Sequence, residues 1–170
     1  MPSVGEPVFR VYLMRHGRSG WARPGQKDFD RTLDNTGVRE AGYVAALAAG
    51  RNLRPDAIFS STAMRCRQTA QLVGPVLAPD LGIIFVDALY AGPTNVYHDL
   101  IGRQAGASVL VVGHNPMMEE LLHDLAGESA ESAIAGGFPT AGLAVIDFQT
   151  RADGKRRSHG GLVAMLTPHG

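Results

Sequence analysis

The chain has 170 residues, of which 45% are hydrophobic and 19% charged, so we expect one globular domain, residues 1–170, with a core of its own. Its formal net charge is zero with the histidines neutral, which argues against a nucleic-acid or membrane partner, because both favour a basic face. A single cysteine, Cys66, allows no intrachain disulfide. No stretch reaches the ~18 apolar residues of a membrane span, and segment 1–7 lacks the pattern of a signal sequence, so we expect a cytoplasmic protein.

The first half of the chain alternates strand and helix patterns. Val8–Met14 is predicted to be a strand, followed by a polar loop over Arg18–Thr32. A helix is predicted over Asp34–Gly50, with Asp34 as N-cap. Its core face is expected to carry Val38, Ala41, Ala45 and Ala48. A second strand over Asp56–Phe59 precedes a helix over Ala63–Val73, for which Gly74-Pro75 marks the end or a kink.

The second half repeats the alternation and then changes. We predict a strand over Ile83–Val86, a helix over Asn95–Gln104 and a strand over Ser108–Val112. The next helix is expected to have Asn115 as N-cap, Pro116 as its first residue and Gly127 at its end. Two final strands, Ala141–Phe148 and Gly161–Leu166, resemble a hairpin. The predicted fold is α/β, a three-layer sandwich whose mostly parallel sheet has helices on both faces.

Three predicted strand ends carry unusual side chains. The first strand leads into Arg15-His16-Gly17, the second into Ser61 and then Arg65, and the fourth into His114. Parallel strands end at one edge of a sheet, where ligands bind in such folds. Two guanidinium groups and two imidazoles at one edge would form a receptor for a tetrahedral dianion. In that setting His16 could act as a nucleophile, and Gly17 would allow close backbone approach.

The same residues resemble the motifs of the histidine phosphatase superfamily, which includes the cofactor-dependent phosphoglycerate mutases. Arg15-His16-Gly17 is similar to its first motif, Ser61 to Thr69 to its Ser-Pro-x-x-Arg-x-x-Gln-Thr block, and Gly113-His114 to its third. Thr62 replaces the usual proline. Chain length and the segment from Arg31 to Gly37 look most like the SixA-type phosphohistidine phosphatases. The similarity covers residues 10 to 148.

The resemblance implies a phosphatase that needs neither a metal nor another cofactor. It would act on a phosphohistidine protein or a small phosphomonoester through a phosphorylated His16. Arg15, Arg65 and His114 would then form the rest of the phosphate pocket. A non-catalytic phosphate-binding module of the same fold and a phosphomutase are the alternatives. The physiological partner and the oligomeric state are not readable from the sequence.

Further residues are candidates for the substrate mouth or for proton transfer. Arg18, Ser19, Trp21 and Arg31 lie in or beside the first loop and could line the mouth or have ordinary loop roles. Many relatives carry a glutamate as the leaving-group acid in mid-chain, but here Leu89-Tyr90 is followed by Ala91. Asp87, Glu119 and Glu120 are the nearest acidic residues, none at the matching position.

Two other phosphatase chemistries are disfavoured. Asp28-Phe29-Asp30-Arg31-Thr32 matches the Asp-x-Asp-x-Thr string of magnesium-dependent enzymes. A loop precedes it, whereas that chemistry needs a buried strand. Cys66 lacks the arginine six residues later that a cysteine phosphatase requires, since Leu72 stands there. The scattered histidines lack the spacing of a zinc site.

Overall fold

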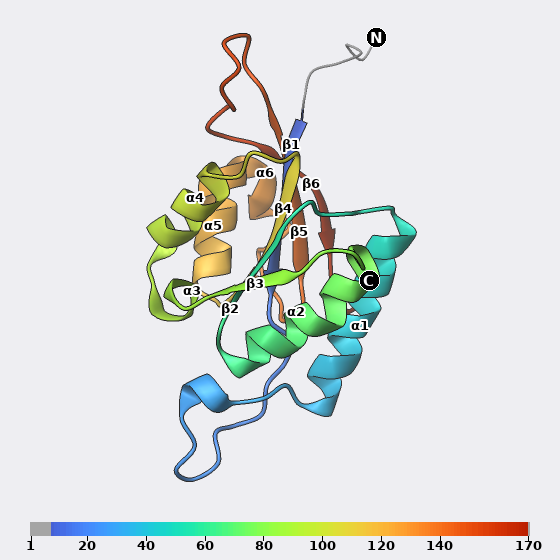
Figure 1. Cartoon of the computed structure of the whole chain (residues 1–170), viewed down its shortest axis with the longest axis vertical. Coiled ribbons are helices and arrows are strands. Elements are labelled where there is room, and N and C mark those ends of the chain that lie inside the picture. The colour runs from blue at the N-terminus through green and yellow to red at the C-terminus, as the bar shows by residue number, and fades with distance from the viewer. Residues whose placement is uncertain (1–7, 170) are drawn as a thin grey trace.

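The computed structural model describes residues 8–169. Its six strands form one sheet in the order β3-β2-β4-β1-β5-β6, shown in Figure 1. The strands are β1 (Val8–Arg15), β2 (Ile58–Ser61), β3 (Ile83–Val86), β4 (Ser108–Gly113), β5 (Leu143–Gln149) and β6 (Gly161–Leu166). Strands β1 to β4 run parallel, while β5 is antiparallel to both β1 and β6. The mostly parallel sheet and the C-terminal antiparallel pair are therefore confirmed.

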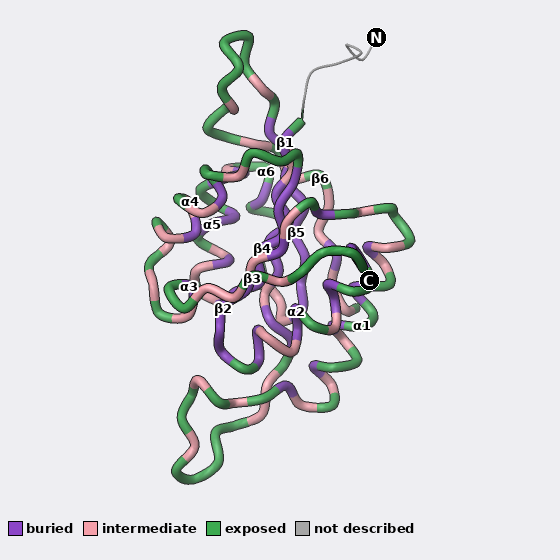
Figure 2. Tube along the Cα trace, in the orientation of Figure 1, coloured by how far each residue is buried: buried purple, intermediate pink, exposed green. Residues whose placement is uncertain are grey.

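Helices cover both faces of the sheet (Figures 1 and 2). One face packs on α1 (Asn35–Gly50) and α2 (Met64–Leu77), and the other on α4 (Thr94–Gly102) and α5 (Met117–Ala126). Each face has its own apolar cluster, centred on alternate residues of β1 such as Leu13 and Met14. The expected three-layer α/β sandwich is confirmed. Sequence patterns did not predict the short elements η1 (Asp28–Asp30), α3 (Ala88–Ala91) and α6 (Glu128–Glu131).

Helix α1 begins as expected, but its buried face is rotated. The Asp34 side chain caps it by accepting a hydrogen bond of 2.7 Å from the Gly37 N–H. Val38 is 42% exposed, and Gly37 and Val44 are buried with the three expected alanines. A Cβ on Gly37 would lie 2.0 Å from the Arg18 carbonyl oxygen. Backbone contact at Gly37 therefore determines which face of α1 is buried. The spacing of apolar residues cannot reveal such a contact, because glycine has no apolar side chain.

Two other helix boundaries differ from the expected ones. Helix α2 continues through Pro75 to Leu77, because Gly74 and Leu77 are buried in this last turn, Gly74 against Ile83. Helix α5 begins at Met117, so Asn115 and Pro116 both lie one position further from the helix than predicted. The Asn115 side chain still caps it, since its Oδ1 accepts a hydrogen bond of 3.2 Å from the Glu119 N–H. Gly127, with φ 55°, follows its last residue as predicted.

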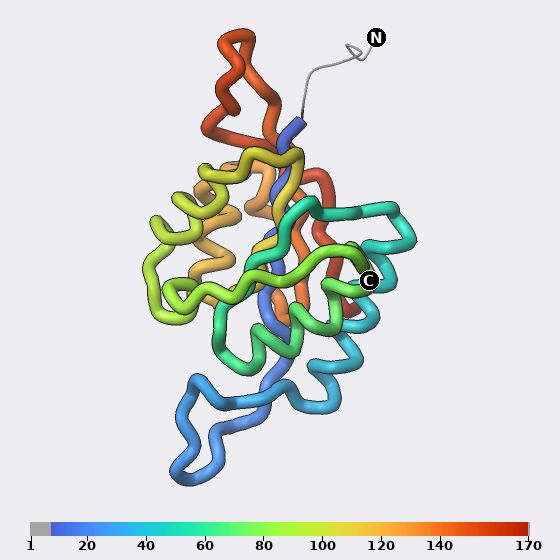
Figure 3. The backbone as a smooth tube through the Cα atoms, viewed as in Figure 1, coloured from blue at the N-terminus to red at the C-terminus, as the bar shows by residue number. Residues whose placement is uncertain are grey.

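Two long loops lie at opposite ends of the molecule (Figure 3). The loop between β1 and α1 extends from the end where β1, β2 and β4 finish, and the polar loop between β5 and β6 extends from the other. Within residues 8–169, no helix is long and apolar enough to cross a bilayer. The prediction about a signal sequence concerns segment 1–7, which lies outside the described residues.

Candidate active site

The sheet order brings the three strand ends together. Strand β4 lies between β1 and β2, and the parallel register sets Arg15 opposite Gly113. The residues after these two, His16 and His114, are therefore neighbours. Their ring centroids are 5.5 Å apart, and the backbone N–H of His16 donates to the Gly113 carbonyl at 3.1 Å. Arg65 comes from the first turn of α2, directly after β2.

His16 is held in one tautomer. Its Nδ1 lies 2.7 Å from the Gly17 carbonyl oxygen. A carbonyl only accepts hydrogen bonds, so we assign the proton to Nδ1, which leaves the lone pair on Nε2. The Gly17 N–H in turn donates to Thr69 Oγ1 at 3.0 Å, which ties this turn to α2. The sequence pattern gave no reason to single out Thr69 for this role.

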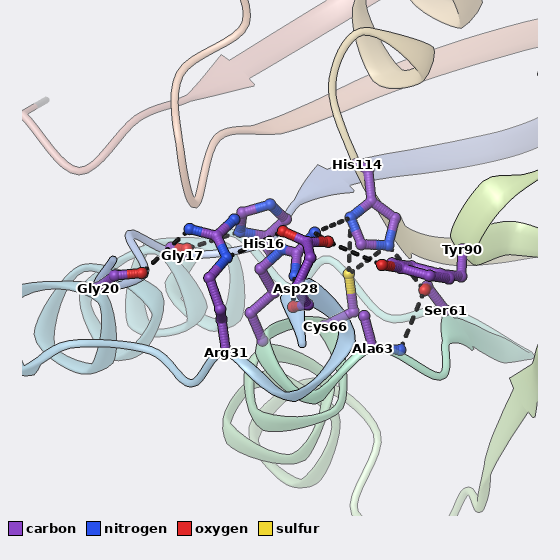
Figure 4. Close-up of polar contacts among 11 residues, drawn as sticks. His16, Gly17, Gly20, Asp28, Arg31, Ser61, Ala63, Cys66, Tyr90 and His114 are labelled. Carbon is purple, nitrogen blue, oxygen red and sulfur yellow. Dashed lines mark hydrogen bonds and ion pairs between the residues drawn. The ribbon is translucent and has the colours of Figure 1, made fainter. Parts of the chain in front are cut away.

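His114 is fixed from two sides (Figure 4). Its Nε2 lies 2.7 Å from Ser61 Oγ, and its Nδ1 lies 3.4 Å from the Arg65 Nη2 donor. The arginine donates, so the consistent tautomer has Nδ1 as acceptor and Nε2–H donating to the serine. Cys66 Sγ packs 3.4 Å from Nε2. Burial raises the pKa of this thiol to about 12, so Cys66 remains protonated.

Burial favours the neutral form of both histidines. His16 is 8% exposed and His114 4%. Burial lowers the pKa of His16 from 6.5 to about 3. Burial, followed by the positive charge of Arg65, lowers the pKa of His114 to about 4. A neutral His16 keeps the lone pair that a nucleophile needs.

The two pocket arginines carry unused donors. Arg15 Nη1 donates to the Phe138 carbonyl at 2.8 Å, and Arg65 Nη1 donates to the Asp28 carbonyl at 2.8 Å. The Nε–H groups of both side chains are buried and have no hydrogen-bond partner. Buried donors are rarely left unpaired in folded proteins. Both guanidinium groups also line the adjoining cavity, where an anion could accept hydrogen bonds from them.

The site opens into a cavity of about 550 Å³. All the predicted site residues except Gly17 line it, which means Arg15, His16, Arg18, Ser19, Arg31, Arg65 and His114. Gly17 lies behind His16, where an added Cβ would be 2.8 Å from the Gly37 carbonyl oxygen. Trp21 is 96% exposed and does not line the cavity. Four arginines and a single carboxylate give the lining a clear preference for anions.

That carboxylate belongs to Asp28, which the sequence reasoning missed. Asp28 opens the short helix η1 after a loop, so it lacks the strand end required of an aspartyl nucleophile. It sits at the cavity mouth beside Tyr90 and Ala91. Asp87, Glu119 and Glu120 are not among the lining residues. In the sequence, Asp28 stands out only as part of the Asp-x-Asp-x-Thr string, because its contact with Arg65, 37 positions away, is tertiary.

The described residues offer no ready metal site. Within residues 8–169, no group of three or more histidine, cysteine, aspartate or glutamate side chains is arranged to hold an ion. The positive charge in the cavity comes from guanidinium groups, which bind phosphate oxygens in pairs. The arrangement can therefore bind a phosphoryl group and present one imidazole nitrogen to it.

Comparison with known proteins agrees with this geometry. The family model described as the histidine phosphatase superfamily (branch 1) matches residues 11–90. A protein of uncharacterised function from Mycobacterium tuberculosis strain H37Rv is 35% identical over 141 residues, which cover 78% of this chain and 85% of that protein. The phosphohistidine phosphatase SixA of Escherichia coli K12 is 25% identical over 150 residues, covering 85% and 89%.

A solved structure extends the similarity to the whole fold. It comes from Agrobacterium tumefaciens and is assigned as a phosphohistidine phosphatase SixA. That chain is 42% identical to this one, with a TM-score of 0.82, and the match covers 94% of this chain and 98% of that one. Together with the strand-end motifs and the cavity they build, these matches show that the chain belongs to the histidine phosphatase superfamily.

Proposed function

We propose that the protein is a metal-independent phosphatase that hydrolyses a phosphohistidine protein or a small phosphomonoester through a phosphorylated His16. One observation carries the proposal. His16 lines an arginine-rich cavity with its Nδ1 bound to the Gly17 carbonyl, so its Nε2 lone pair is free to attack. The guanidinium groups of Arg15 and Arg65, which also line the cavity, are donors for the oxygens of the transferred phosphoryl group.

In the first step, His16 Nε2 attacks phosphorus in line with the leaving group. The new P–N bond forms as the bond to the leaving group breaks. The ring becomes an N-phosphorylated imidazolium that keeps its proton on Nδ1, where the Gly17 carbonyl accepts the hydrogen bond. Arg15 and Arg65 hold the equatorial oxygens while charge spreads over them. The bound dianion also favours protonation of the neighbouring His114, which can then donate to a phosphate oxygen.

In the second step, water attacks phosphorus and the P–N bond breaks. The electron pair returns to Nε2 and restores neutral His16. Both protons of the water leave with the product as dihydrogen phosphate, so the enzyme ends in its starting state. The step needs no metal-bound hydroxide, because the imidazolium is already a good leaving group.

The cavity favours substrates whose leaving group departs without receiving a proton from the protein. A phosphohistidine protonated on its distal nitrogen departs as a neutral imidazole when its phosphoryl group passes to His16, so no proton transfer is required. An alkyl ester would leave as a strongly basic alkoxide and would need a general acid. Ala91 and its neighbours provide no acid at the mouth, where Asp28 is the lining carboxylate. Phosphohistidine is therefore the better substrate class, and aryl phosphates are serviceable probes.

Turnover separates this function from its alternatives. Wild type and His16→Ala are assayed with phosphoimidazole and p-nitrophenyl phosphate in EDTA. We expect steady hydrolysis by wild type and a loss of at least ~10³-fold in the variant. Tight phosphate binding without turnover would instead indicate a binding module, and transfer to a second organic acceptor would indicate a phosphomutase. Activity lost in EDTA and restored by magnesium would contradict metal independence.

A further inference from the structure

Asp28 is an ionised group held in a fixed position at the cavity mouth. Its Oδ2 accepts hydrogen bonds from Arg65 Nη2 at 3.0 Å and from the Tyr90 hydroxyl at 2.8 Å, and its Oδ1 accepts one from Arg31 Nε at 3.0 Å (Figure 4). These three donors come from α2, α3 and the loop after η1. The Asp28 side chain is 54% exposed, but these three hydrogen bonds hold its carboxylate in one position.

Asp28 is exposed whereas the phosphate-site residues are buried, so we infer that it lies on the side where a leaving group would depart. His16 and Arg65 are nearly buried, at 8% and 6% exposure, whereas Asp28 is open to solvent. In-line attack places the leaving group opposite His16 Nε2, on the solvent side of the phosphoryl group. Tyr90, which donates to Asp28, packs edge-on to His114 with ring centroids 5.6 Å apart. The carboxylate therefore contacts two residues that line the cavity with it, Arg65 and Tyr90, and would border a leaving group on the solvent side.

The carboxylate can accept a hydrogen bond but cannot donate a proton. Partial burial opposes its ionisation, but the hydrogen bonds from Tyr90 and Arg65 outweigh this and lower its pKa to about 2. All three of its contacts are with donors, as an ionised carboxylate requires. Oδ1 accepts only the bond from Arg31 among the described residues, so it can accept a further hydrogen bond.

We propose that Asp28 selects the leaving group, by accepting a hydrogen bond from the protonated distal nitrogen of a phosphohistidine imidazolium. The inference rests on the proposed function and deepens it. A site for alkyl esters needs a donor at the mouth, and this site supplies an anionic acceptor. Only a leaving group that brings its own proton and positive charge complements such an acceptor.

The step balances with the groups present. The P–N bond of the substrate breaks, and its electron pair returns to the substrate ring as the bond to His16 Nε2 forms. The distal N–H stays on the departing imidazole, hydrogen-bonded to Asp28. Asp28 neither gains nor loses a proton, and its charge favours the imidazolium form of the substrate that reacts.

Substitution of Asp28 by asparagine tests the inference, because the side chain keeps its size and loses its charge. The matched control is Asp30→Asn, on the same short helix, exposed and outside the cavity lining. The kcat/KM values for phosphoimidazole and p-nitrophenyl phosphate are measured at one pH, with inorganic phosphate as inhibitor. Thermal unfolding of each variant checks that it is folded.

We expect Asp28→Asn to lower the ratio of kcat/KM for phosphoimidazole to that for p-nitrophenyl phosphate by roughly 10- to 100-fold, the range for a charge-assisted hydrogen bond. Asp30→Asn should leave the ratio within about twofold. An unchanged ratio in Asp28→Asn would overturn the inference. Both values falling together would show that Asp28 only positions Arg65. Both values rising, with tighter phosphate inhibition, would show that it only competes with phosphate. Absence of turnover in wild type would refute the proposed function itself.

Discussion

At the scale of single residues, the site depends on how each polar atom is already engaged. His16 has one nitrogen bound to its own chain and one free, and Arg15 and Arg65 each have a buried Nε–H without a partner. Contacts with backbone carbonyl groups hold all three side chains in position. Such preorganisation stabilises charge in a transition state without reorganisation at the moment of reaction.

Removal of either pocket arginine should therefore affect rate more than folding. We expect Arg15→Ala and Arg65→Ala each to lose at least ~100-fold in kcat/KM, as for removal of one preorganised oxyanion donor. Arg67→Ala is the control, because Arg67 lies on the same helix as Arg65 but stacks on Phe85 and donates to the Thr62 carbonyl, outside the cavity. Near-normal kcat/KM in either pocket variant, with the melting temperature unchanged, would remove that arginine from the mechanism.

The mouth should make turnover depend steeply on the leaving group. Asp28, which is ionised, is the only carboxylate among the described residues that line the cavity, so the departing oxygen should receive no proton from the protein, a contribution worth ~10²- to 10⁴-fold elsewhere. Across a series of aryl and alkyl phosphates, kcat/KM should fall sharply as leaving-group pKa rises. Asp87→Asn and Glu119→Gln should leave the slope unchanged, since neither residue lines the cavity. A shallow slope that steepens in one of these variants would identify the acid that we find absent.

At the scale of elements, the position of the turn that carries His16 depends on close contact between the Gly17 and Gly37 backbones. An added Cβ on Gly37 would lie 2.0 Å from the Arg18 carbonyl oxygen, and one on Gly17 would lie 2.8 Å from the Gly37 carbonyl oxygen. Helix α1 can only pack against the turn after β1 because both side chains are absent. This contact fixes the start of the loop that carries Arg18, Asp28 and Arg31 to the cavity.

Gly37→Ala should therefore disturb both stability and activity. We expect the free energy of unfolding to fall by about 2 kcal/mol or more, since backbone must move to relieve the overlap. The KM should rise as the loop shifts. Gly42→Ala is the control in the same helix, exposed and with nothing within 4 Å of its Cβ. It should stabilise α1 by up to about 1 kcal/mol. Similar denaturant midpoints for the two variants would show that the glycine contact has no structural role.

Local signals in the sequence predicted the helices and strands themselves better than they predicted the contacts between them. The Asp34 cap, the alternation of strands and helices and the strand-end motifs were all readable, because each depends on neighbouring residues. The burial of Gly37 in place of Val38, the last turn of α2 beyond Pro75 and the start of α5 at Met117 were not. Each of those is decided by packing between segments far apart in the chain.

The same distinction holds within the site. Arg15, His16, Arg65 and His114 could be placed in one cavity because parallel strands end at one edge. Asp28 and Tyr90 could not, since they meet across 62 positions through a loop and a four-residue helix. In the sequence, Ser61 stands out only as part of a motif. Its hydrogen bond to His114 depends on the register of the sheet, which local patterns do not specify.

At the scale of the whole molecule, burial of two neutral histidines links stability to pH. The pKa values of His16 and His114 fall from 6.5 to about 3 and about 4 in the folded state. Between pH 6.5 and those values, the unfolded chain binds more protons than the folded one. The stability contributed by the neutral histidines is therefore complete above pH 6.5 and is lost as pH falls below it.

We expect the free energy of unfolding to decrease by about 1 to 2 kcal/mol per histidine between pH 6.5 and pH 5. Asp28 does not contribute to the change between pH 6.5 and pH 5, because its pKa is lowered to about 2 and it stays ionised throughout this range. Urea unfolding at a series of pH values, in phosphate-free buffer, measures the slope. The His16→Asn, His114→Asn double variant should be flatter across this range. An equal slope in the double variant would assign the effect to other groups.

If His16 is the nucleophile, it must become phosphorylated during turnover. Rapid quench of wild type with phosphorus-labelled substrate measures this directly. We predict a labelled protein adduct that is stable in base, labile in acid, located on His16, and formed and consumed at rates compatible with kcat. Slow variants such as His114→Ala should accumulate it. Full hydrolysis with no such adduct, in wild type and in the slow variants alike, would contradict a histidine nucleophile.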